Sequence, residues 1–151
     1  MEKSNTNTNF ARYSSLEEKT VFITGGASGI GAELVRAFAA QKSRVGFIDL
    51  DEANSQSIAS EAGEDIAFEI CDLRDISALR NAFSSLAGRL GSADILVNNA
   101  ARDDRHNWQD VTPEYFHERI ATNLWRHFFA LQAVAPGMIE AGGGRDPHIS
   151  Q

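Results

Sequence analysis

The chain has 151 residues, 42% of them hydrophobic, and a formal net charge of −7. A chain of this length can bury one hydrophobic core and is short for two domains. The acidic balance, with no basic stripe, argues against nucleic acid as a partner. The one cysteine, Cys71, excludes an internal disulfide and favours a reducing compartment. Because no apolar run approaches the length of a membrane span, we expect a cytoplasmic protein that does not insert into a membrane.

Four short apolar runs alternate with segments of helical periodicity. The runs predict strands at 19–24, 44–49, 65–70 and 93–98, and the periodic segments predict helices at 29–41, 52–62, 75–90 and 112–140. Alternation of strands and helices is typical of a parallel sheet that is covered on both faces. We therefore predict an α/β fold with a Rossmann-like, doubly wound parallel sheet.

Both ends of the chain differ in composition from this alternating region. Residues 1–16 are polar and predict a flexible arm. After the three glycines at 142–144, where a fifth apolar strand would begin, residues 145–151 are charged and contain Pro147, which makes them a poor core strand. We therefore expect an incomplete Rossmann domain over 17–144, truncated after the fourth strand and its following helix, and then an atypical polar tail. The edge of the fourth strand would be open.

A glycine-rich turn follows the first predicted strand directly. It runs Thr24-Gly25-Gly26-Ala27-Ser28-Gly29-Ile30-Gly31 and opens the first predicted helix. Glycine lets the backbone turn tightly and approach a ligand closely, and a helix N-terminus offers unpaired N–H groups and a partial positive charge. A strand, a glycine turn and a helix in this order predict a phosphate-binding site.

An acidic residue ends the second predicted strand. Asp49 lies about twenty residues after the glycine turn, where a dinucleotide-binding fold places an acid against the hydroxyls of the adenine ribose. A helix cap or a turn residue is the alternative for Asp49 taken alone. Together with the glycine turn, Asp49 predicts NAD as the cofactor, because a carboxylate repels the 2′-phosphate of NADP.

The spacing of the turn, G-x-x-x-G-x-G, resembles that of the short-chain dehydrogenase/reductase family. Two further segments fit the family: Cys71-Asp72-Leu73 after the third apolar run, and Asn98-Asn99-Ala100-Ala101 after the fourth. The resemblance covers about residues 17–151. On structure alone, the alternative for Asp72 and Asp75 is to cap the following helix, and for Asn98 to form a turn at the end of a strand.

The resemblance implies an NAD-dependent oxidoreductase and assigns roles within its cofactor site. Asp72 and Leu73 would hold the adenine, and Asn98 to Ala100 would line the groove beside the adenosine ribose. The full set of predicted cofactor-binding residues is Gly25, Ser28, Gly29, Ile30, Gly31, Asp49, Leu50, Asp72, Leu73, Asn98, Asn99 and Ala100.

The segment that leaves the fourth predicted strand carries the candidate substrate residues. Asn99 to His106, read with Asn123-Leu124 and residues 132–138, resembles the sugar 1-dehydrogenases of the family, which oxidise aldoses such as xylose, arabinose or galactose. The implied substrate is an aldose, whose hydroxyls need directional donors and acceptors. These would come from Asp103, Asp104, Arg105 and His106. A solvated polar loop is the alternative for each residue, and no metal site is expected because no further ligand cluster accompanies them.

The catalytic set of the family is present only in part. Asn123 matches its helix asparagine, which implies a local distortion of the helix and support of a water-mediated proton relay. The family also uses a serine and a Tyr-x-x-x-Lys pair, in which the lysine lowers the tyrosine pKa. Of the two tyrosines, Tyr13 is followed four residues later by Glu17, and Tyr115 by Arg119. We therefore expect these 151 residues to lack the catalytic Ser, Tyr and Lys.

Two hypotheses follow from this departure. The first is the cofactor-binding part of an NAD-dependent sugar dehydrogenase, in a chain shortened relative to the family. The second is a catalytically inactive module that binds a dinucleotide or has a regulatory role. The apolar surface predicted over residues 115–134 is wider than one sheet face can cover, so we expect either more chain or another subunit to pack there, and we expect a homo-oligomer.

Overall fold

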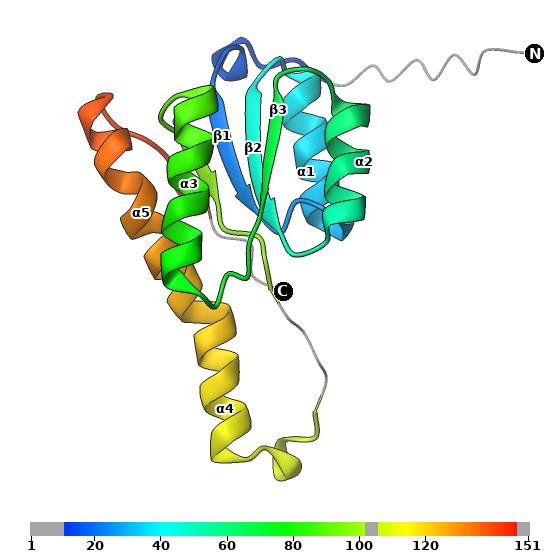
Figure 1. Cartoon of the computed structure of the whole chain (residues 1–151), viewed down its shortest axis with the longest axis vertical. Coiled ribbons are helices and arrows are strands. Elements are labelled where there is room, and N and C mark those ends of the chain that lie inside the picture. The colour runs from blue at the N-terminus through cyan, green and yellow to red at the C-terminus, as the bar shows by residue number, and fades with distance from the viewer. Residues whose placement is uncertain (1–10, 102–105, 148–151) are drawn as a thin grey trace, which may run out of the picture.

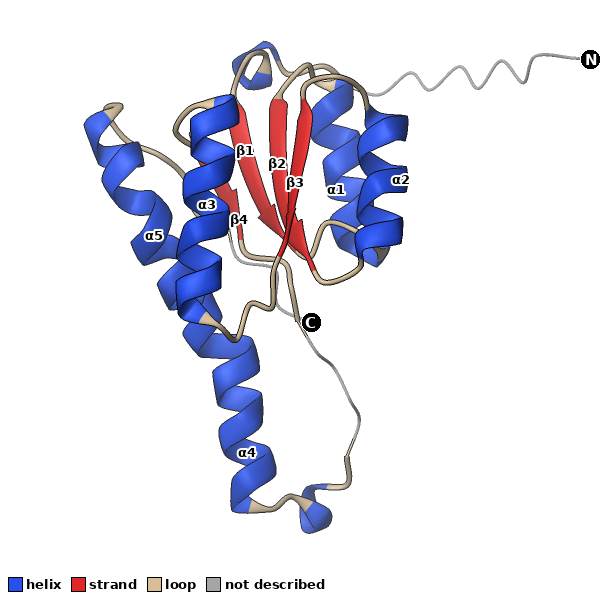
Figure 2. Cartoon of the chain, in the orientation of Figure 1, coloured by secondary structure: helices blue, strands red, loops and turns tan. Residues whose placement is uncertain are grey.

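The computed structural model describes residues 11–101 and 106–147. A parallel sheet at the centre contains β1 (Thr20–Thr24), β2 (Arg44–Asp49), β3 (Ile66–Ile70) and β4 (Ile95–Val97), in the order β3-β2-β1-β4. One face is covered by α1 (Gly29–Ala40) and α2 (Glu52–Ala62), and the other by α3 (Ile76–Leu90) and α5 (Arg126–Glu140) (Figure 1). Figure 2 shows the strands between these two helical layers. The predicted α/β fold with a Rossmann-like sheet is confirmed.

Two apolar cores lie on opposite faces of the sheet, because alternate residues of a strand point to opposite sides. In β1, Val21 and Ile23 belong to the core under α1 and α2, whereas Phe22 belongs to the core under α3 and α5. Phe22 stacks on Phe83 of α3, with ring centroids 5.9 Å apart. Burial on both faces explains why the strands read as continuous apolar runs.

The helix N-termini differ in how their N–H groups are satisfied. Asp51 caps α2 by accepting from the Asn54 N–H, and Asp75 caps α3 by accepting from the Ala78 N–H, both at 3.0 Å. Ser28 occupies the cap position of α1 but forms no side-chain cap hydrogen bond. The first N–H groups of α1 therefore lack the side-chain acceptor that the other two helices have.

The predicted helix 112–140 is interrupted. It consists of α4 (Pro113–Ile120), a π-helical turn at Ala121–Trp125 and then α5. This turn contains Asn123, whose family role implies a local distortion of the helix at this place. A π-helical turn adds one residue to a helical turn without breaking the run of apolar side chains, so the periodicity does not reveal it. In Figure 1, α4 extends past the end of the sheet.

The start of the polar tail lies beside β4. The Leu96 N–H donates to the Arg145 carbonyl at 2.9 Å, and the Asn98 N–H donates to the Pro147 carbonyl at 3.2 Å. Residues 145–147 are exposed, as their polar composition predicts, but backbone pairing does not require apolar side chains. The edge of β4 is therefore partly paired, where the sequence predicts an open edge.

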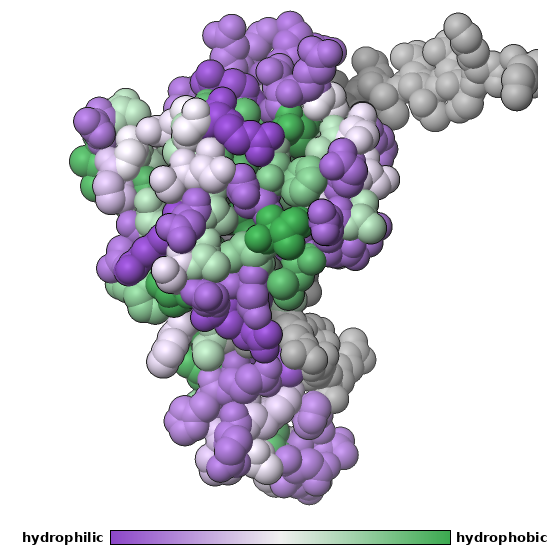
Figure 3. Space-filling model, in the orientation of Figure 1, coloured by the Kyte–Doolittle hydropathy of each residue, from purple (hydrophilic) through white to green (hydrophobic). Residues whose placement is uncertain are grey.

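Two groups of apolar side chains are exposed. The first comprises Phe116, Leu124, Trp125 and Phe128, from α4 to the start of α5, which are 57–61% exposed. The second lies at the carboxyl ends of β2 and β3, where Figure 3 shows an apolar area and where Leu50 and Ile70 are exposed. In the part of the chain that the structure describes, no helix has the length and apolar character to cross a membrane.

Candidate cofactor site

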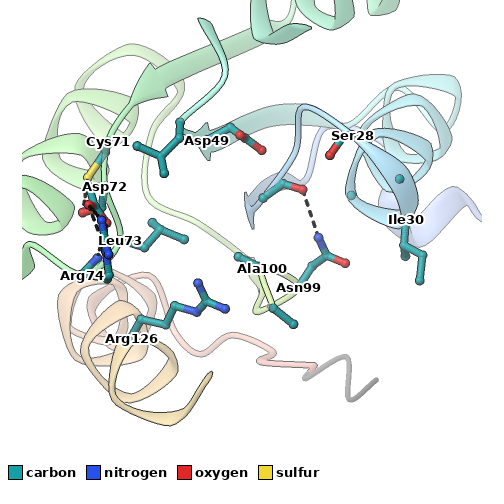
Figure 4. Close-up of a pocket in the computed structure, with 15 residues that line it drawn as sticks. Ser28, Ile30, Asp49, Cys71, Asp72, Leu73, Arg74, Asn99, Ala100 and Arg126 are labelled. Atoms are coloured by element: carbon teal, nitrogen blue, oxygen red, sulfur yellow. Dashed lines mark hydrogen bonds and ion pairs between the residues drawn. The ribbon is translucent and has the colours of Figure 1, made fainter. Parts of the chain in front are cut away.

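A cavity of about 500 Å³ opens at the carboxyl ends of the strands, where the strand order reverses between β1 and β4. Ligands of Rossmann-like sheets bind at this place. The cavity, shown in Figure 4, is lined by Gly25, Ser28, Gly29, Ile30, Gly31, Asp49, Leu50, Cys71, Asp72, Leu73, Arg74, Asn99, Ala100, Ala101 and Arg126. The structure thus brings together every predicted cofactor-binding residue except Asn98.

The glycine turn forms one wall of the cavity. Gly25 and Gly29 have φ values of +74° and +53°, which favour glycine, and a Cβ on Gly31 would lie 1.7 Å from the Gly25 carbonyl oxygen. The backbone can pass this closely only because no side chain is present. The turn leads into α1, whose cap residue Ser28 leaves the helix N-terminus without a side-chain acceptor. This wall offers backbone N–H groups and the positive end of a helix dipole.

Asp49 is fixed at the end of β2 by backbone donors. Its Oδ2 accepts from the Ala27 N–H at 2.9 Å, and its Oδ1 accepts from the Asp51 N–H at 3.1 Å. The carboxylate therefore braces the glycine turn from the neighbouring strand. Each carboxylate oxygen has a second lone pair, so Asp49 retains capacity to accept hydrogen bonds from a ligand.

Asn99 joins the ends of β4 and β1. Its side-chain amide donates to the carbonyls of Thr24 and Gly25 at 3.1 and 3.0 Å. The Thr24 hydroxyl accepts from the N–H groups of Asn99 and Ala100, both at 3.1 Å. This network holds the floor of the cavity between the two strands.

Asn98 is not among the residues that line the cavity, so its place in the cofactor groove stays a prediction. Its side chain is buried, and its amide donates to the Asp146 carboxylate at 2.9 Å. Asn98 thus ties the tail to the end of β4.

Asp72 is held by Arg74. The Arg74 guanidinium donates to both carboxylate oxygens, with its shortest contact at 2.6 Å from Nη2 to Oδ2, and the Arg74 N–H donates to Oδ1 at 2.9 Å. The Arg74 hydrogen bonds hold the pKa of Asp72 below its usual value. The cap of α3 is Asp75, so the alternative role of Asp72 as a helix cap is wrong.

Arg126 is a lining residue that the sequence reasoning missed. It begins α5, is 8% exposed, and points its guanidinium into the cavity in Figure 4. Burial lowers the pKa of Arg126 to about 10, and the Asp72 carboxylate opposes this shift. The side chain remains charged at neutral pH. The sequence feature that indicates Arg126 is its spacing of three residues from Asn123, which places both side chains on one helical face.

The predicted catalytic and substrate residues lie toward α4. Asn123 is in the π-helical turn, and its Oδ1 accepts from Arg126 Nη2 at 3.2 Å. The exposed His106 ring lies against Tyr115 of α4, with centroids 4.2 Å apart, and does not line the cavity. The other three candidates, Asp103, Asp104 and Arg105, lie outside the described residues.

Cys71 lines the cavity but is a poor nucleophile. Burial, with the carboxylates of Asp75, Asp72 and Glu69, raises the pKa of the Cys71 thiol to about 11. The thiol is therefore protonated at neutral pH, and the reactive thiolate is scarce. Over residues 11–101 and 106–147, no group of three His, Cys, Asp or Glu side chains is arranged to hold a metal ion.

The parallel sheet, the glycine turn before α1 and the acidic end of β2 define the Rossmann-like class of α/β proteins. The model of one such family, described as short chain dehydrogenase, matches residues 19–145. The chain belongs to this short-chain dehydrogenase family.

Similar proteins include two sugar dehydrogenases. The chain is 46% identical over 137 residues to a D-xylose 1-dehydrogenase of Caulobacter vibrioides (strain NA1000 / CB15N). It is 44% identical over 138 residues to a probable galactose dehydrogenase of Rhizobium meliloti (strain 1021). Each match covers 89% of this chain and 54% of the relative, so the chain spans about half the length of these curated relatives.

A solved structure with a similar fold contains a nicotinamide dinucleotide. It is the 3-ketoacyl-(acyl-carrier-protein) reductase from Brucella melitensis complexed with NADH. The TM-score is 0.79 at 29% sequence identity, and the match covers 84% of this chain and 53% of that chain.

Proposed function

We propose that the chain binds NAD in the cavity and forms the cofactor-binding part of an oxidoreductase that oxidises an aldose at C1. Membership of the short-chain dehydrogenase family supports an oxidoreductase. The names of the two relatives, for D-xylose and galactose, support a sugar substrate. The NADH in the similar reductase supports a nicotinamide dinucleotide as cofactor.

The glycine turn is the observation that carries this proposal. Gly31 can pass the Gly25 carbonyl only without a Cβ, and the adjoining N-terminus of α1 has no side-chain cap. Both features fit a diphosphate, which needs close backbone N–H donors and positive charge. In this proposal Ser28 to Gly31 hold the pyrophosphate, and Asp72 and Leu73 hold the adenine. NAD, when bound, supplies the hydride acceptor for the oxidation.

The choice of NAD over NADP rests on Asp49. Its carboxylate accepts hydrogen bonds from ribose hydroxyls and repels a 2′-phosphate. The cation that lines the cavity after β3, Arg74, is already paired with Asp72. No Lys or Arg stands between Gly25 and Gly31 to offset the Asp49 charge. We therefore place the adenine ribose against Asp49.

The substrate end of the proposal lies around Asn123. Asn123 supports a proton path there, and His106, Asp103, Asp104 and Arg105 contact the aldose. Asn123 and the cavity are linked through Arg126, which lines the cavity and donates to Asn123. This link supports an active centre that continues from the cavity toward α4.

A second candidate function is a catalytically inactive dinucleotide-binding or regulatory module. The observation that favours it is the lack of a Tyr-x-x-x-Lys pair in these 151 residues. General base catalysis contributes about 10² to 10⁴ in rate, so we expect the purified chain to bind NADH but to reduce NAD with aldoses at a negligible rate. Robust NADH production would contradict this expectation. The mass of the natural gene product separates a module from a part of a longer enzyme.

Calorimetric titration with NADH and NADPH tests the proposed function. We expect NADH to bind and NADPH to bind about tenfold more weakly or worse. Gly31→Ala should abolish binding, because its Cβ collides with the Gly25 carbonyl. Gly88→Ala is the matched control, since a Cβ there meets open space on α3. If neither nucleotide binds to a folded wild-type chain, the proposal is wrong.

A further inference from the structure

We propose that Arg126 is a cofactor-recognition residue whose guanidinium binds the adenosine half of the dinucleotide, from the side of the cavity opposite Asp49. The inference rests on the proposed function and adds to it a residue outside the predicted cofactor set. In Figure 4, Asp49 and Arg126 lie across the cavity from each other, and the Arg126 guanidinium is directed into the space between them.

The hydrogen bonds of Arg126 do not satisfy its guanidinium. Nη2 donates to Asn123 Oδ1 at 3.2 Å, whereas Nε is buried and has no partner in the described part of the chain. Only 8% of the residue is exposed, so water replaces the missing acceptors poorly. A buried cation with unmet donors destabilises a fold unless an acceptor arrives with a ligand.

The nearby carboxylate does not neutralise Arg126. Asp72 attracts it electrostatically, but both Asp72 oxygens are bound by Arg74 in a fork-like geometry. The described residues include no ion pair of Arg126 itself. The positive charge of Arg126 is therefore available to a ligand in the cavity.

The position of Arg126 favours the adenosine half. Ser28 and Ile30, where we place the pyrophosphate, lie on the right in Figure 4. Arg126 lies on the left, near Leu73 and Ala100. A guanidinium is flat and carries several donors, so it can stack on a base and donate to ring nitrogens or ribose oxygens. An adenosine moiety offers both a flat face and such acceptors. A lysine in the same place would supply only a point charge.

Calorimetry of three variants tests this assignment. The ligands are NADH and ADP-ribose, which carries the adenosine and pyrophosphate without the nicotinamide. We expect Arg126→Met to weaken the binding of both ligands equally, by about tenfold or more, since the variant loses charge-assisted hydrogen bonds to the adenosine. Arg126→Lys should recover part of the loss. Arg44→Met, an exposed arginine at the amino end of β2, removes the same charge and should leave both affinities unchanged.

The outcomes separate this inference from the proposed function. If the wild-type chain and a folded Arg126→Met variant bind both ligands equally well, the inference is wrong and the proposed function stands. If Arg126→Met weakens NADH but not ADP-ribose, Arg126 acts at the nicotinamide half and the assignment is wrong. If the wild-type chain binds neither ligand, both proposals fail. A thermal melt of each variant, with Arg126→Lys as the conservative replacement, shows whether the fold is intact.

Discussion

Three charged side chains of the cavity wall are held in different ways. Asp49 accepts two backbone N–H groups, Asp72 is paired with Arg74, and Arg126 has one contact to Asn123. Asp72 and Arg74 partly offset each other's charge. Asp49 and Arg126 remain, one of each sign, on opposite sides of the cavity. A ligand with hydroxyls at one end and acceptor nitrogens near the other would match this pattern.

The sequence predicts most of the site because the site is built from short motifs at strand ends. The glycine turn, Asp49 and Asp72-Leu73 follow β1, β2 and β3, and a parallel sheet brings these ends together. Asn98 donates to Asp146, whereas Asn99 of the same motif lines the cavity, and the motif does not state which side chain of the pair faces inward. Arg126 was missed because it comes from a helix and its role depends on burial, which spacing alone does not give.

Asp49→Asn tests the ribose assignment at the level of one residue. The substitution keeps the shape and removes the charge, so hydrogen bonds from ribose hydroxyls weaken and the repulsion of a 2′-phosphate disappears. We expect NADH affinity to fall about tenfold and the gap between NADH and NADPH to narrow. Glu52 is an exposed acid in the first turn of α2, and Glu52→Gln is the control. It should change neither the NADH affinity nor the gap between NADH and NADPH. If calorimetry of Asp49→Asn shows an unchanged preference for NADH over NADPH, Asp49 does not bind the ribose hydroxyls.

At the scale of elements, the strands and the first three helices follow from hydrophobic periodicity. The π-helical turn does not follow from periodicity, because the apolar stripe runs on through it, and only the resemblance at Asn123 indicates a distortion of the helix there. The pairing of residues 145–147 with β4 does not follow either, because backbone hydrogen bonds carry it and the side chains stay polar. Sequence reasoning thus succeeds where apolar burial decides the structure and fails where backbone bonding decides it.

Ser28→Asp tests whether the bare N-terminus of α1 serves a ligand. A carboxylate at this cap position interacts favourably with the helix dipole, so we expect unfolding free energy to rise by about 0.5 kcal/mol. The same charge faces the proposed pyrophosphate, so NADH affinity should fall about tenfold or more. Asp75→Ala provides the opposite case: it removes the cap of α3, should cost about 1 kcal/mol, and should leave NADH affinity unchanged. Thermal melts measure the change in stability, and calorimetry measures the change in NADH affinity. A Ser28→Asp variant that binds NADH as tightly as the wild-type chain would show that the pyrophosphate does not bind at the N-terminus of α1.

For the whole molecule, the exposed aromatic surface at α4 and α5 is the main unpartnered feature. Phe116, Leu124, Trp125 and Phe128 are each more than half exposed, and a hollow of about 440 Å³ lies among Leu124, Trp125, Phe128 and Phe129. Apolar surface of this kind promotes association. The chain spans about half the length of the two sugar dehydrogenases that it matches, so two partners are considered for the surface: further chain or a second copy.

We predict that the chain self-associates through this surface. Sedimentation velocity should show dimers or larger species that grow with concentration, and Trp125→Ser with Phe128→Ser should shift the chain toward the monomer. Tyr13→Ser removes an aromatic side chain that is 60% exposed but lies far from α4 in the sequence, and it should not alter association. A clean monomer of the wild-type chain at the highest soluble concentration would refute this prediction.

We propose that the cavity at the carboxyl ends of the strands binds NAD, and a crystal structure of the wild-type chain grown with NADH tests this proposal. We predict the pyrophosphate at Ser28 to Gly31, the adenine ribose at Asp49, and the adenine between Leu73 and Arg126. NADH bound elsewhere, or an NADH-saturated chain whose cavity holds no nucleotide, would contradict the account.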